Sequence, residues 1–472
     1  MPPALGSRRF TVSIGSTCPK ALSLSAGSAS GRSSQGKRFA HLGSKRRPFG
    51  GLPRFVYVCR GARQVLRHTS IQNKMSYIPR LLTALLLGLA SLSECFGQWI
   101  WHDPLQAGQA SYIHGQGWDE DGGNYHRLPD RAQAKVRDKV WQLACQSAGL
   151  TLRFRTDARE LSLRYQTTQP LSMPHMPSTG VAGVDLYRAG DLAFCFGSYS
   201  FGDTIRYSYR IDSASDSPEE TEYILYLPLY NEVSRLEIGV PTGSSFAFVP
   251  APQERPIVLY GTSIAQGACA SRPGMAWANI LGRELGQPLI DLGFSGNGKL
   301  EEELISLIAE QRPSLVILDC MPNMGGIDSD EIIRRLKSAV HRLSALPDLS
   351  ILLIEHAGNS NALTDQAEGA KSVRSNQAQR EAYRQLQSEG LQGLYYLSRE
   401  ELGLPPDAWV DYVHPSDLGM RQYASAVLHK IKALQGSKAL ASRMPAARPQ
   451  QPRSKNHPLG TARLSPRSSN IR

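Results

Sequence analysis

The sequence predicts an α/β domain whose parallel sheet is covered by helices on both faces, and this domain is preceded by a β-sandwich. Two observations predict it. Short apolar runs alternate with helical stretches throughout residues 256–435, whereas residues 98–250 contain many short strand-like runs broken by turn residues. The pattern changes near Pro256, so we expect a domain boundary there.

The first part has the alternation of half-buried strands. Residues 150–156 (LTLRFRT) and 161–167 (LSLRYQT) alternate apolar and polar side chains, and residues 157–160 predict a hairpin turn between them. Further runs of the same kind are GVDLYRAGDLAFCFGSY, DTIRYSYRI, TEYILYLPL and SRLEIGVP. Many short strands at fairly regular spacing favour a β-sandwich over residues 98–250.

The second part has the pattern of a buried parallel sheet. Apolar strands of four to six residues alternate with helices of three or more turns, which requires helices on both faces of the sheet. The predicted strands are PIVLYG, PLIDLG, LVILDC, SILLIE and GLYYLS. The predicted helices cover residues 275–285, 299–311, 328–343, 372–388 and 417–434.

The positive charge belongs to the two ends of the chain. Residues 1–74 contain fourteen Lys or Arg and residues 437–472 contain eight, and neither segment contains Asp or Glu. The rest of the chain has 31 basic against 41 acidic side chains. Neither end interleaves aromatic residues with its charges, so we expect no nucleic-acid partner. Periodicity ends after Gln435, and we expect a disordered basic tail over residues 436–472.

A targeting segment begins at Met75. Arg80 precedes an apolar run over residues 81–92, and Cys95 and Gly97 stand at −3 and −1 of a possible cleavage site. Residues 75–97 therefore predict a signal peptide, a secreted or periplasmic location and no stable membrane span in the mature form. A single anchor helix is the alternative. Residues 1–74 are interpreted as a non-native or disordered extension, with an organelle transit peptide as the other reading.

Four cysteines lie beyond the predicted signal peptide: Cys145, Cys195, Cys269 and Cys320. They have no CxxC spacing, and no further His, Asp or Glu cluster stands near the candidate catalytic residues at ligand spacing. We therefore expect no metal and no cofactor. Export permits disulfides, but buried free thiols are equally compatible with the sequence.

Polar residues and glycines follow successive predicted strands, where the active site of an open parallel sheet is expected. Ser263 follows the first strand on a strand-to-helix turn, although a serine there could simply cap the helix. Gly296 lies in a glycine-rich turn after the second strand, where a backbone N–H can approach an oxyanion. Asn323, after the third strand, can donate from its amide, but could be an ordinary turn residue.

Asp411 and His414 follow the last strand. A carboxylate three residues before an imidazole can fix its tautomer and leave the other nitrogen free to take a proton from Ser263. Alone, the pair could be a structural loop or half of a metal site. Together the four positions predict a nucleophile, an oxyanion hole and a base.

These positions resemble the four blocks of the SGNH (GDSL-like) hydrolases. GTSI contains Ser263, FSG ends at Gly296, PN ends at Asn323, and DYVHP contains Asp411 and His414. The resemblance implies a flavodoxin-like three-layer α/β/α domain over residues 255–435 with a Ser263–His414–Asp411 triad. It also assigns the backbone N–H groups of Ser263 and Gly296 and the Asn323 amide to the oxyanion hole.

The sequence departs from the family at Thr262, where Asp is usual, and at Pro322, where Gly is usual. A largely bacterial subgroup tolerates both changes and carries an N-terminal β-rich domain with a GxDLY signature. Residues 183–187 (GVDLY), 127–129 (RLP) and 140–150 (VWQLACQSAGL) resemble that domain.

The resemblance implies a serine esterase that hydrolyses short acyl esters, with acetyl groups on carbohydrate as the expected substrate. The expected partner is therefore a small-molecule or polysaccharide ester. Two alternatives stay open. One is a thioesterase or lysophospholipase with the same machinery, and the other is a non-catalytic glycan-binding protein. An α/β-hydrolase would have G-x-S-x-G and a distant acid, and neither is present at Ser263.

Overall fold

The computed structural model describes residues 98–108, 111–118, 123–211 and 220–443, with side chains up to residue 435. All of these residues belong to one compact unit, Leu86–Arg472. The predicted extension (1–74), the predicted signal peptide (75–97) and most of the predicted tail lie outside the described residues.

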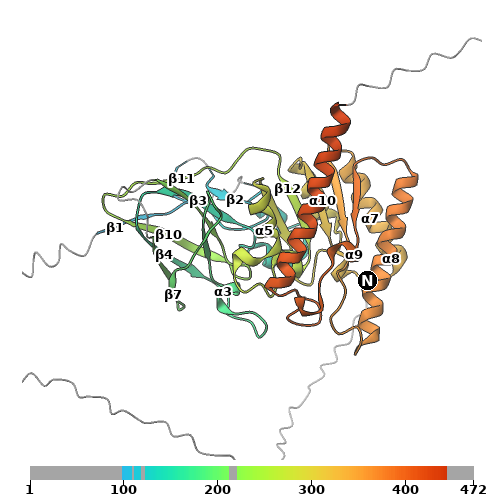
Figure 1. Cartoon of the computed structure of the whole chain (residues 1–472), viewed down its shortest axis with the longest axis horizontal. Coiled ribbons are helices and arrows are strands. Elements are labelled where there is room, and N and C mark those ends of the chain that lie inside the picture. The colour runs from blue at the N-terminus through green and yellow to red at the C-terminus, as the bar shows by residue number, and fades with distance from the viewer. Residues whose placement is uncertain (1–97, 109–110, 119–122, 212–219, 444–472) are drawn as a thin grey trace, which may run out of the picture. The chain divides into compact units, whose positions relative to one another are not determined.

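Two antiparallel sheets form the first part of the described chain (Figure 1). One has the strand order β1 (Trp99–His102), β10 (Val233–Pro241), β4 (Glu160–Thr167), β8 (Ile205–Arg210), β7 (Ser198–Ser200). The other has the order β11 (Phe246–Phe248), β3 (Thr151–Thr156), β9 (Thr221–Tyr226), β5 (Asp185–Arg188), β6 (Phe194–Cys195), with β2 (Ile113–His114) also paired to β3.

The two sheets bury their facing sides against each other. In β4 every second residue is buried (Leu161, Leu163 and Tyr165), and these side chains share one core with Leu152 and Phe154 of β3. Period-two alternation produces one apolar face per sheet, and two such faces packed together make a sandwich. The predicted β-sandwich is therefore confirmed.

The predicted hairpin between residues 150–156 and 161–167 is wrong. Both strands form, as β3 and β4, but β3 pairs with β2, β9 and β11 while β4 pairs with β8 and β10. The intervening residues therefore cross from one sheet to the other, and Ala158 is buried in the crossing. Alternation shows that a strand has one buried face, but it does not identify the hydrogen-bonding partner.

The second part contains a five-stranded parallel sheet. Its order is β13 (Leu289–Gly293), β12 (Ile257–Gly261), β14 (Leu315–Asp319), β15 (Ser350–Ile354), β16 (Leu394–Leu397). Numbered along the chain, the strand order is 2-1-3-4-5, which is that of flavodoxin-like folds. The order in which strands are added reverses beside β12, so the topological switch point lies there. The predicted fold class is confirmed.

Helices cover both faces of this sheet. On one face α5 (Trp277–Leu285) packs beside α10 (Asp417–Arg443), and on the other α6 (Glu302–Glu310), α7 (Ser329–Ser344) and α8 (Gln366–Ser388) lie in sequence (Figure 1). Within β12, Ile257 and Leu259 join the core under α5 and α10, whereas Val258 and Tyr260 join the core under α6–α8. Each strand is therefore buried on both sides, which explains its continuous apolar sequence.

The helix boundaries differ from the prediction mainly at two places. Helix α8 begins at Gln366, before the predicted start at 372, because Asp365 caps it by accepting a hydrogen bond from the Glu368 N–H. Helix α10 continues to Arg443 instead of ending near Gln435. Within the described residues, no helix has both the length and the apolar character that a membrane span requires.

The remaining helical segments are short. They are η2 (Asp130–Ala132), α2 (Asp138–Ala144), α3 (Ser178–Val181), α4 (Ser263–Gln266), η3 (Pro273–Met275), η4 (Met321–Asn323), α9 (Arg399–Leu402) and η5 (Pro406–Ala408). The four cysteines named above are all free thiols in this structure.

Candidate active site

Ser263 lies directly after the carboxyl end of β12, where the strand order reverses. It is the first residue of α4, and the Thr262 side chain caps the helix by accepting a hydrogen bond from the Ile264 N–H. The N–H of a first helical residue has no acceptor within its own helix, so the Ser263 N–H remains available to a ligand. The sequence therefore places a hydroxyl and a backbone donor at one point.

Glycines allow the turn after β13 to lie against this point. A Cβ atom on Gly298, whose φ is +74°, would stand 2.0 Å from the Gly261 carbonyl oxygen. A Cβ atom on Gly293 would stand 2.2 Å from the Gln266 nitrogen. A Cβ atom cannot stand at either distance. Only glycine therefore lets the turn after β13 lie this close to the end of β12 and to α4.

His414 and Asp411 lie in a loop that reaches Ser263. The Ser263 Oγ and His414 Nε2 atoms are 2.8 Å apart, and His414 Nδ1 lies 2.7 Å from Asp411 Oδ2. The other carboxylate oxygen accepts from the backbone N–H groups of Val413, at 2.9 Å, and His414, at 2.8 Å. The three predicted triad residues therefore form one chain of hydrogen bonds.

The surroundings keep the Asp411 carboxylate ionised. Partial burial raises its pKa, but the hydrogen bonds from the His414 ring and from the backbone N–H groups of Val413 and His414 outweigh burial, so the net pKa is lowered. An ionised Asp411 favours the tautomer that has its hydrogen on Nδ1 and its lone pair on Nε2. In that tautomer Nε2 can accept a hydrogen bond from the Ser263 hydroxyl.

The predicted oxyanion-hole residues lie in two neighbouring turns. Gly296 is in the turn after β13 with a φ of +68°, a left-handed conformation that glycine adopts without strain. Asn323 ends η4, and its side-chain amide donates to the Asn297 carbonyl in the same turn as Gly296. An amide carries two hydrogens, so one donor of Asn323 remains beyond this bond.

Both parts of the chain match known protein families. Residues 254–432 match the GDSL-like lipase/acylhydrolase family, and residues 99–246 match the GxDLY domain, the N-terminus of SGNH-hydrolase-type esterases. A protein described as a GDSL-like lipase from Bacteroides ovatus is 30% identical and covers 72% of this chain and 98% of its own, with a TM-score of 0.65. The chain belongs to the GDSL-like lipase/acylhydrolase family. It is a hydrolase.

A second solved structure shares the fold. A salicylyl-acyltransferase from a tetracycline biosynthetic pathway is 17% identical, covers 71% of this chain and 95% of its own, and has a TM-score of 0.55. No curated protein matches the sequence of the chain. The recognised family, including its GxDLY domain, agrees with the resemblance drawn from the sequence.

The GxDLY signature joins the β-sandwich to this GDSL-like hydrolase domain. Asp185 is buried, and its Oδ2 accepts from Arg272 Nη1 and from the Gly274 N–H, both at 2.7 Å. Arg272 also donates to the Tyr187 hydroxyl at 2.8 Å. The signature therefore holds the segment that follows α4, a role that the sequence did not reveal.

Arg127 was noted in the sequence only as part of RLP, but it supports the site. Its guanidinium is fully buried and donates to the Gly293 carbonyl at 2.6 Å, and also to Leu143 and Gln146. Gly293 is the last residue of β13, so Arg127 ties the sandwich side of the chain to the turn that contains Gly296.

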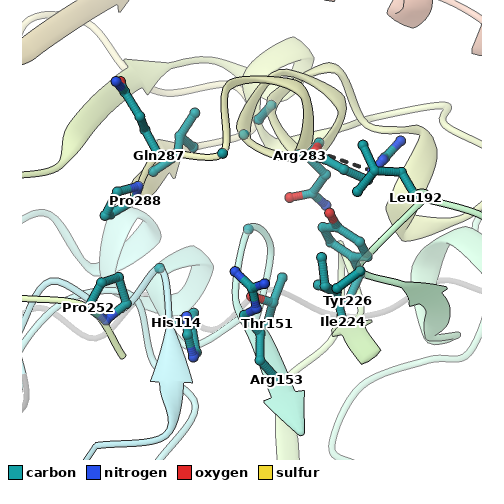
Figure 2. Close-up of a pocket in the computed structure, with 18 of the residues that line it drawn as sticks. His114, Thr151, Arg153, Leu192, Ile224, Tyr226, Pro252, Arg283, Gln287 and Pro288 are labelled. Carbon is teal, nitrogen blue, oxygen red and sulfur yellow. Dashed lines mark hydrogen bonds between the residues drawn. The ribbon is translucent and has the colours of Figure 1, made fainter. Parts of the chain in front are cut away.

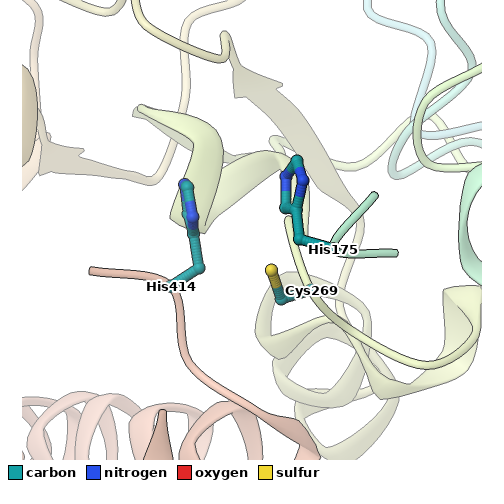
Figure 3. A group of neighbouring side chains, drawn as sticks. All are labelled: His175, Cys269 and His414. Carbon is teal, nitrogen blue, oxygen red and sulfur yellow. The ribbon is translucent and has the colours of Figure 1, made fainter. Parts of the chain in front are cut away.

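His175 and Cys269 also lie beside the triad. The His175 ring, from the loop before α3, stacks on the His414 ring with centroids 5.9 Å apart, and the Cys269 thiol lies beside both (Figure 3). Neither residue was a candidate, because their proximity to His414 depends on the packing of the sandwich against the hydrolase domain.

A cavity of about 400 Å³ lies at the opposite edge of the sheet, between the sandwich and α5 (Figure 2). Both arginines that line it have partners: Arg153 pairs with Glu222 at 2.5 Å, and Arg283 donates to the Gly274 carbonyl at 3.1 Å. Pro288, just before β13, lines it, so the cavity is near the amino ends of the strands, away from Ser263.

Proposed function

We propose that this hydrolase is a serine esterase that cleaves short acyl esters through an acyl-enzyme formed on Ser263. The observation that carries the proposal is the chain of hydrogen bonds from Ser263 Oγ to His414 Nε2, 2.8 Å, and from His414 Nδ1 to Asp411, 2.7 Å. A hydroxyl with an oriented imidazole at hydrogen-bond distance is the arrangement that nucleophilic catalysis requires.

In the proposed first step, His414 Nε2 takes the Ser263 proton as Oγ attacks the ester carbonyl. The resulting imidazolium is stabilised by Asp411, and it then gives the proton to the departing alcohol. In the second step, His414 deprotonates water, which attacks the acyl-enzyme and regenerates Ser263. The scheme uses no cofactor.

The negative oxygen of each tetrahedral intermediate would be held by three donors. These are the backbone N–H groups of Ser263 and Gly296 and the free amide hydrogen of Asn323. What supports the assignment is the first-turn position of Ser263 and the hydrogen bond that ties Asn323 to the turn of Gly296. Donors fixed before the reaction stabilise developing charge without reorganising.

The proposed substrate is an acetyl ester, on carbohydrate in the natural setting. The support is the resemblance of the sequence to secreted carbohydrate-esterase-type proteins, together with the predicted signal peptide over residues 75–97. An enzyme exported to the periplasm or the medium would meet acylated polysaccharides. In the same proposal, residues 98–250 form the sandwich domain and residues 255–435 the catalytic domain.

The test is hydrolysis of p-nitrophenyl acetate and p-nitrophenyl octanoate by residues 98–443, which include the whole of α10. Ser263→Ala should lower turnover about 10³-fold or more, and Asp411→Asn should lower it on the order of 10²–10⁴-fold, while both proteins stay folded. Ser306→Ala is the matched control, because Ser306 lies on α6 and its hydroxyl donates only to the Glu302 carbonyl of its own helix.

The two acyl chains separate the alternatives. Faster turnover of acetate supports the short-chain esterase, whereas faster turnover of octanoate favours the thioesterase or lysophospholipase reading. Equal rates for the wild type and a folded Ser263→Ala variant would eliminate the triad. Glycan affinity that survives Ser263→Ala, without turnover, would then identify a binding protein.

A further inference from the structure

Three side chains of metal-ligand type converge at the catalytic base. They are His175 from the sandwich, Cys269 from the segment after α4, and His414 from the loop before α10. One nitrogen of each ring and the sulfur atom all lie within 4.8 Å of one another. Figure 3 shows the two rings facing each other with the Cys269 sulfur at the side between them.

We propose that His175, Cys269 and His414 form a zinc-binding site, and that a bound Zn²⁺ ion switches the hydrolase off. The inhibitory part of the proposal rests on the proposed role of His414 as the base. The binding part depends only on the three ligands. From the sequence alone we expect no metal site, because these residues are 94 and 145 positions apart along the chain.

The donor set selects the ion. Imidazole nitrogen and thiolate sulfur are the ligands that Zn²⁺ prefers, whereas Mg²⁺ and Ca²⁺ require oxygen. On a tetrahedral Zn²⁺ ion, two such ligands stand about 3.4–3.6 Å apart. The observed limit of 4.8 Å therefore requires the ligand atoms to approach one another by about 1.2–1.4 Å at most. His175 is exposed and can supply most of this movement.

The other two ligands are held in place. Cys269 has a φ of +69°, an unfavourable conformation for a residue with a Cβ atom, which the surrounding contacts maintain. The Ala268 N–H donates to the Ser263 carbonyl at 2.9 Å, and the Ser271 N–H donates to Asp417 at the start of α10 at 2.8 Å. These bonds fix the position of Cys269 relative to the loop of His414.

The loop of His175 is tied to the same segment. The Thr179 hydroxyl, on α3, donates to the Ser271 carbonyl at 2.7 Å. Met173 and Met176, on either side of His175, exchange backbone hydrogen bonds, and Met176 is buried in the shared core. The sandwich therefore presents His175 at a defined place, with solvent access for an incoming ion.

Occupancy of the site is incompatible with catalysis. His414 forms two hydrogen bonds, through Nε2 to the Ser263 hydroxyl and through Nδ1 to the Asp411 carboxylate. Coordination of Zn²⁺ through either nitrogen removes one of these two hydrogen bonds. Cysteine binds Zn²⁺ as the thiolate, so the thiol proton of Cys269 passes to water as the Zn–S bond forms.

The chain contains a comparison group. His126, Cys145 and Glu232 also bring three ligand atoms within 4.8 Å, but they lie between the sandwich loops and α2 and do not include a triad residue. Zn²⁺ bound there should not block hydrolysis. Cys145→Ser is therefore a matched control for Cys269→Ser, because each substitution replaces one sulfur ligand by oxygen in a group of three possible ligands.

The experiment uses the full chain without a polyhistidine tag. Turnover of p-nitrophenyl acetate is measured over a range of free Zn²⁺ concentrations, and each variant is normalised to its own rate without zinc. We expect Zn²⁺ to inhibit the wild type and the Cys145→Ser variant alike. His175→Ala and Cys269→Ser should each need about tenfold or more additional Zn²⁺ for half inhibition. Mg²⁺ and Ca²⁺ at the same concentrations should not inhibit.

Equilibrium dialysis in the Cys145→Ser background separates binding from activity. We expect one Zn²⁺ ion per chain, weakened about tenfold or more by His414→Ala, His175→Ala or Cys269→Ser. If the chain has no esterase activity, this measurement still decides the binding proposal. Zinc binding that none of the three substitutions weakens overturns it. Inhibition that Cys145→Ser relieves and Cys269→Ser does not would place the inhibitory ion at the other group.

Discussion

Asp319 is the last residue of strand β14, and its carboxyl group is fully buried at the carboxyl edge of the sheet. The Tyr423 hydroxyl donates to its Oδ1 at 2.8 Å, while its Oδ2 is buried without a hydrogen-bond partner among the described residues. Burial raises the pKa of Asp319, the Tyr423 hydrogen bond lowers it and the neighbouring Asp291 charge raises it, and the net result is a pKa of about 7.

This residue predicts a pH dependence of stability. The ordinary pKa of 3.8 applies to the unfolded chain and about 7 to the folded one, so between these pH values the folded state holds more protons. The free energy of unfolding should therefore fall as pH rises from about 4 to about 7, and stay level above. Asp319→Asn should gain on the order of 2–4 kcal/mol over the wild type across this window.

Urea unfolding at several pH values measures the effect. The exposed Asp407→Asn variant removes the same charge without releasing a buried carboxyl, so its difference from wild type should be nearly independent of pH. A pH-independent difference for Asp319→Asn as well would show that Asp319 is already ionised at low pH in the folded protein.

At the scale of elements, the turn after β13 depends on contacts from outside the sheet. Arg127 donates to the carbonyl of Gly293 and stacks over the ring of Phe294, with 4.9 Å from Cζ to the ring centroid. Burial lowers the Arg127 pKa to about 10, and the nearby Asp291 carboxylate opposes this decrease. A buried guanidinium that donates to several backbone carbonyls fixes the turn more firmly than the turn residues could alone.

Replacing Arg127 tests this support. Arg127→Met should lower the free energy of unfolding by about 3–5 kcal/mol, because it leaves buried carbonyls and the Asp291 carboxyl without their cation. It should also lower turnover, since the carbonyl of Gly293 fixes the turn of Gly296. Arg131→Ala is the control, because Arg131 pairs with Glu310 at the surface and should cost at most about 1 kcal/mol.

Denaturant unfolding gives the stability and ester hydrolysis gives the activity of both variants. Equal stabilities of the Arg127→Met and Arg131→Ala proteins would mean that the carbonyls of the Arg127 site find other donors. Unchanged turnover in a destabilised Arg127→Met protein would mean that the turn of Gly296 keeps its place without the arginine.

At the scale of the whole described unit, the sandwich and the hydrolase domain share hydrophobic cores. Leu229 and Tyr230, from the sandwich, lie in the same core as Ile264 and Trp277 of the hydrolase domain. Helix α2 packs with α6 on the other face of the parallel sheet. Neither domain can separate without exposing buried apolar surface to water.

We therefore predict that the two domains unfold together. Hydrogen exchange should give the same free energy of opening, within about 1 kcal/mol, for the slowest amides of β4 and of β14. A calorimetric scan should show one transition whose calorimetric and van 't Hoff enthalpies agree. Two transitions, or a much lower opening energy for one domain, would show that the shared core does not couple them.

The sequence by itself determined the local features. Apolar runs of four to six residues between helical stretches predicted all five parallel strands, and alternation predicted the inward faces of the sandwich, because side-chain periodicity reflects the secondary structure in which it occurs. The placement of Ser263, Gly296, Asn323 and His414 after four of the five parallel strands could also be predicted, since parallel strands bring their carboxyl ends to one edge.

Only the tertiary structure decided which distant segments meet. Strands β3 and β4 joined different sheets, Arg127 reached the carbonyl of Gly293, and His175 and Cys269 came to lie beside His414. None of these contacts follows a sequence period, because each depends on how the sandwich packs against the hydrolase domain. That packing is chosen by the fit of the shared core as a whole, and no single segment of the sequence specifies it.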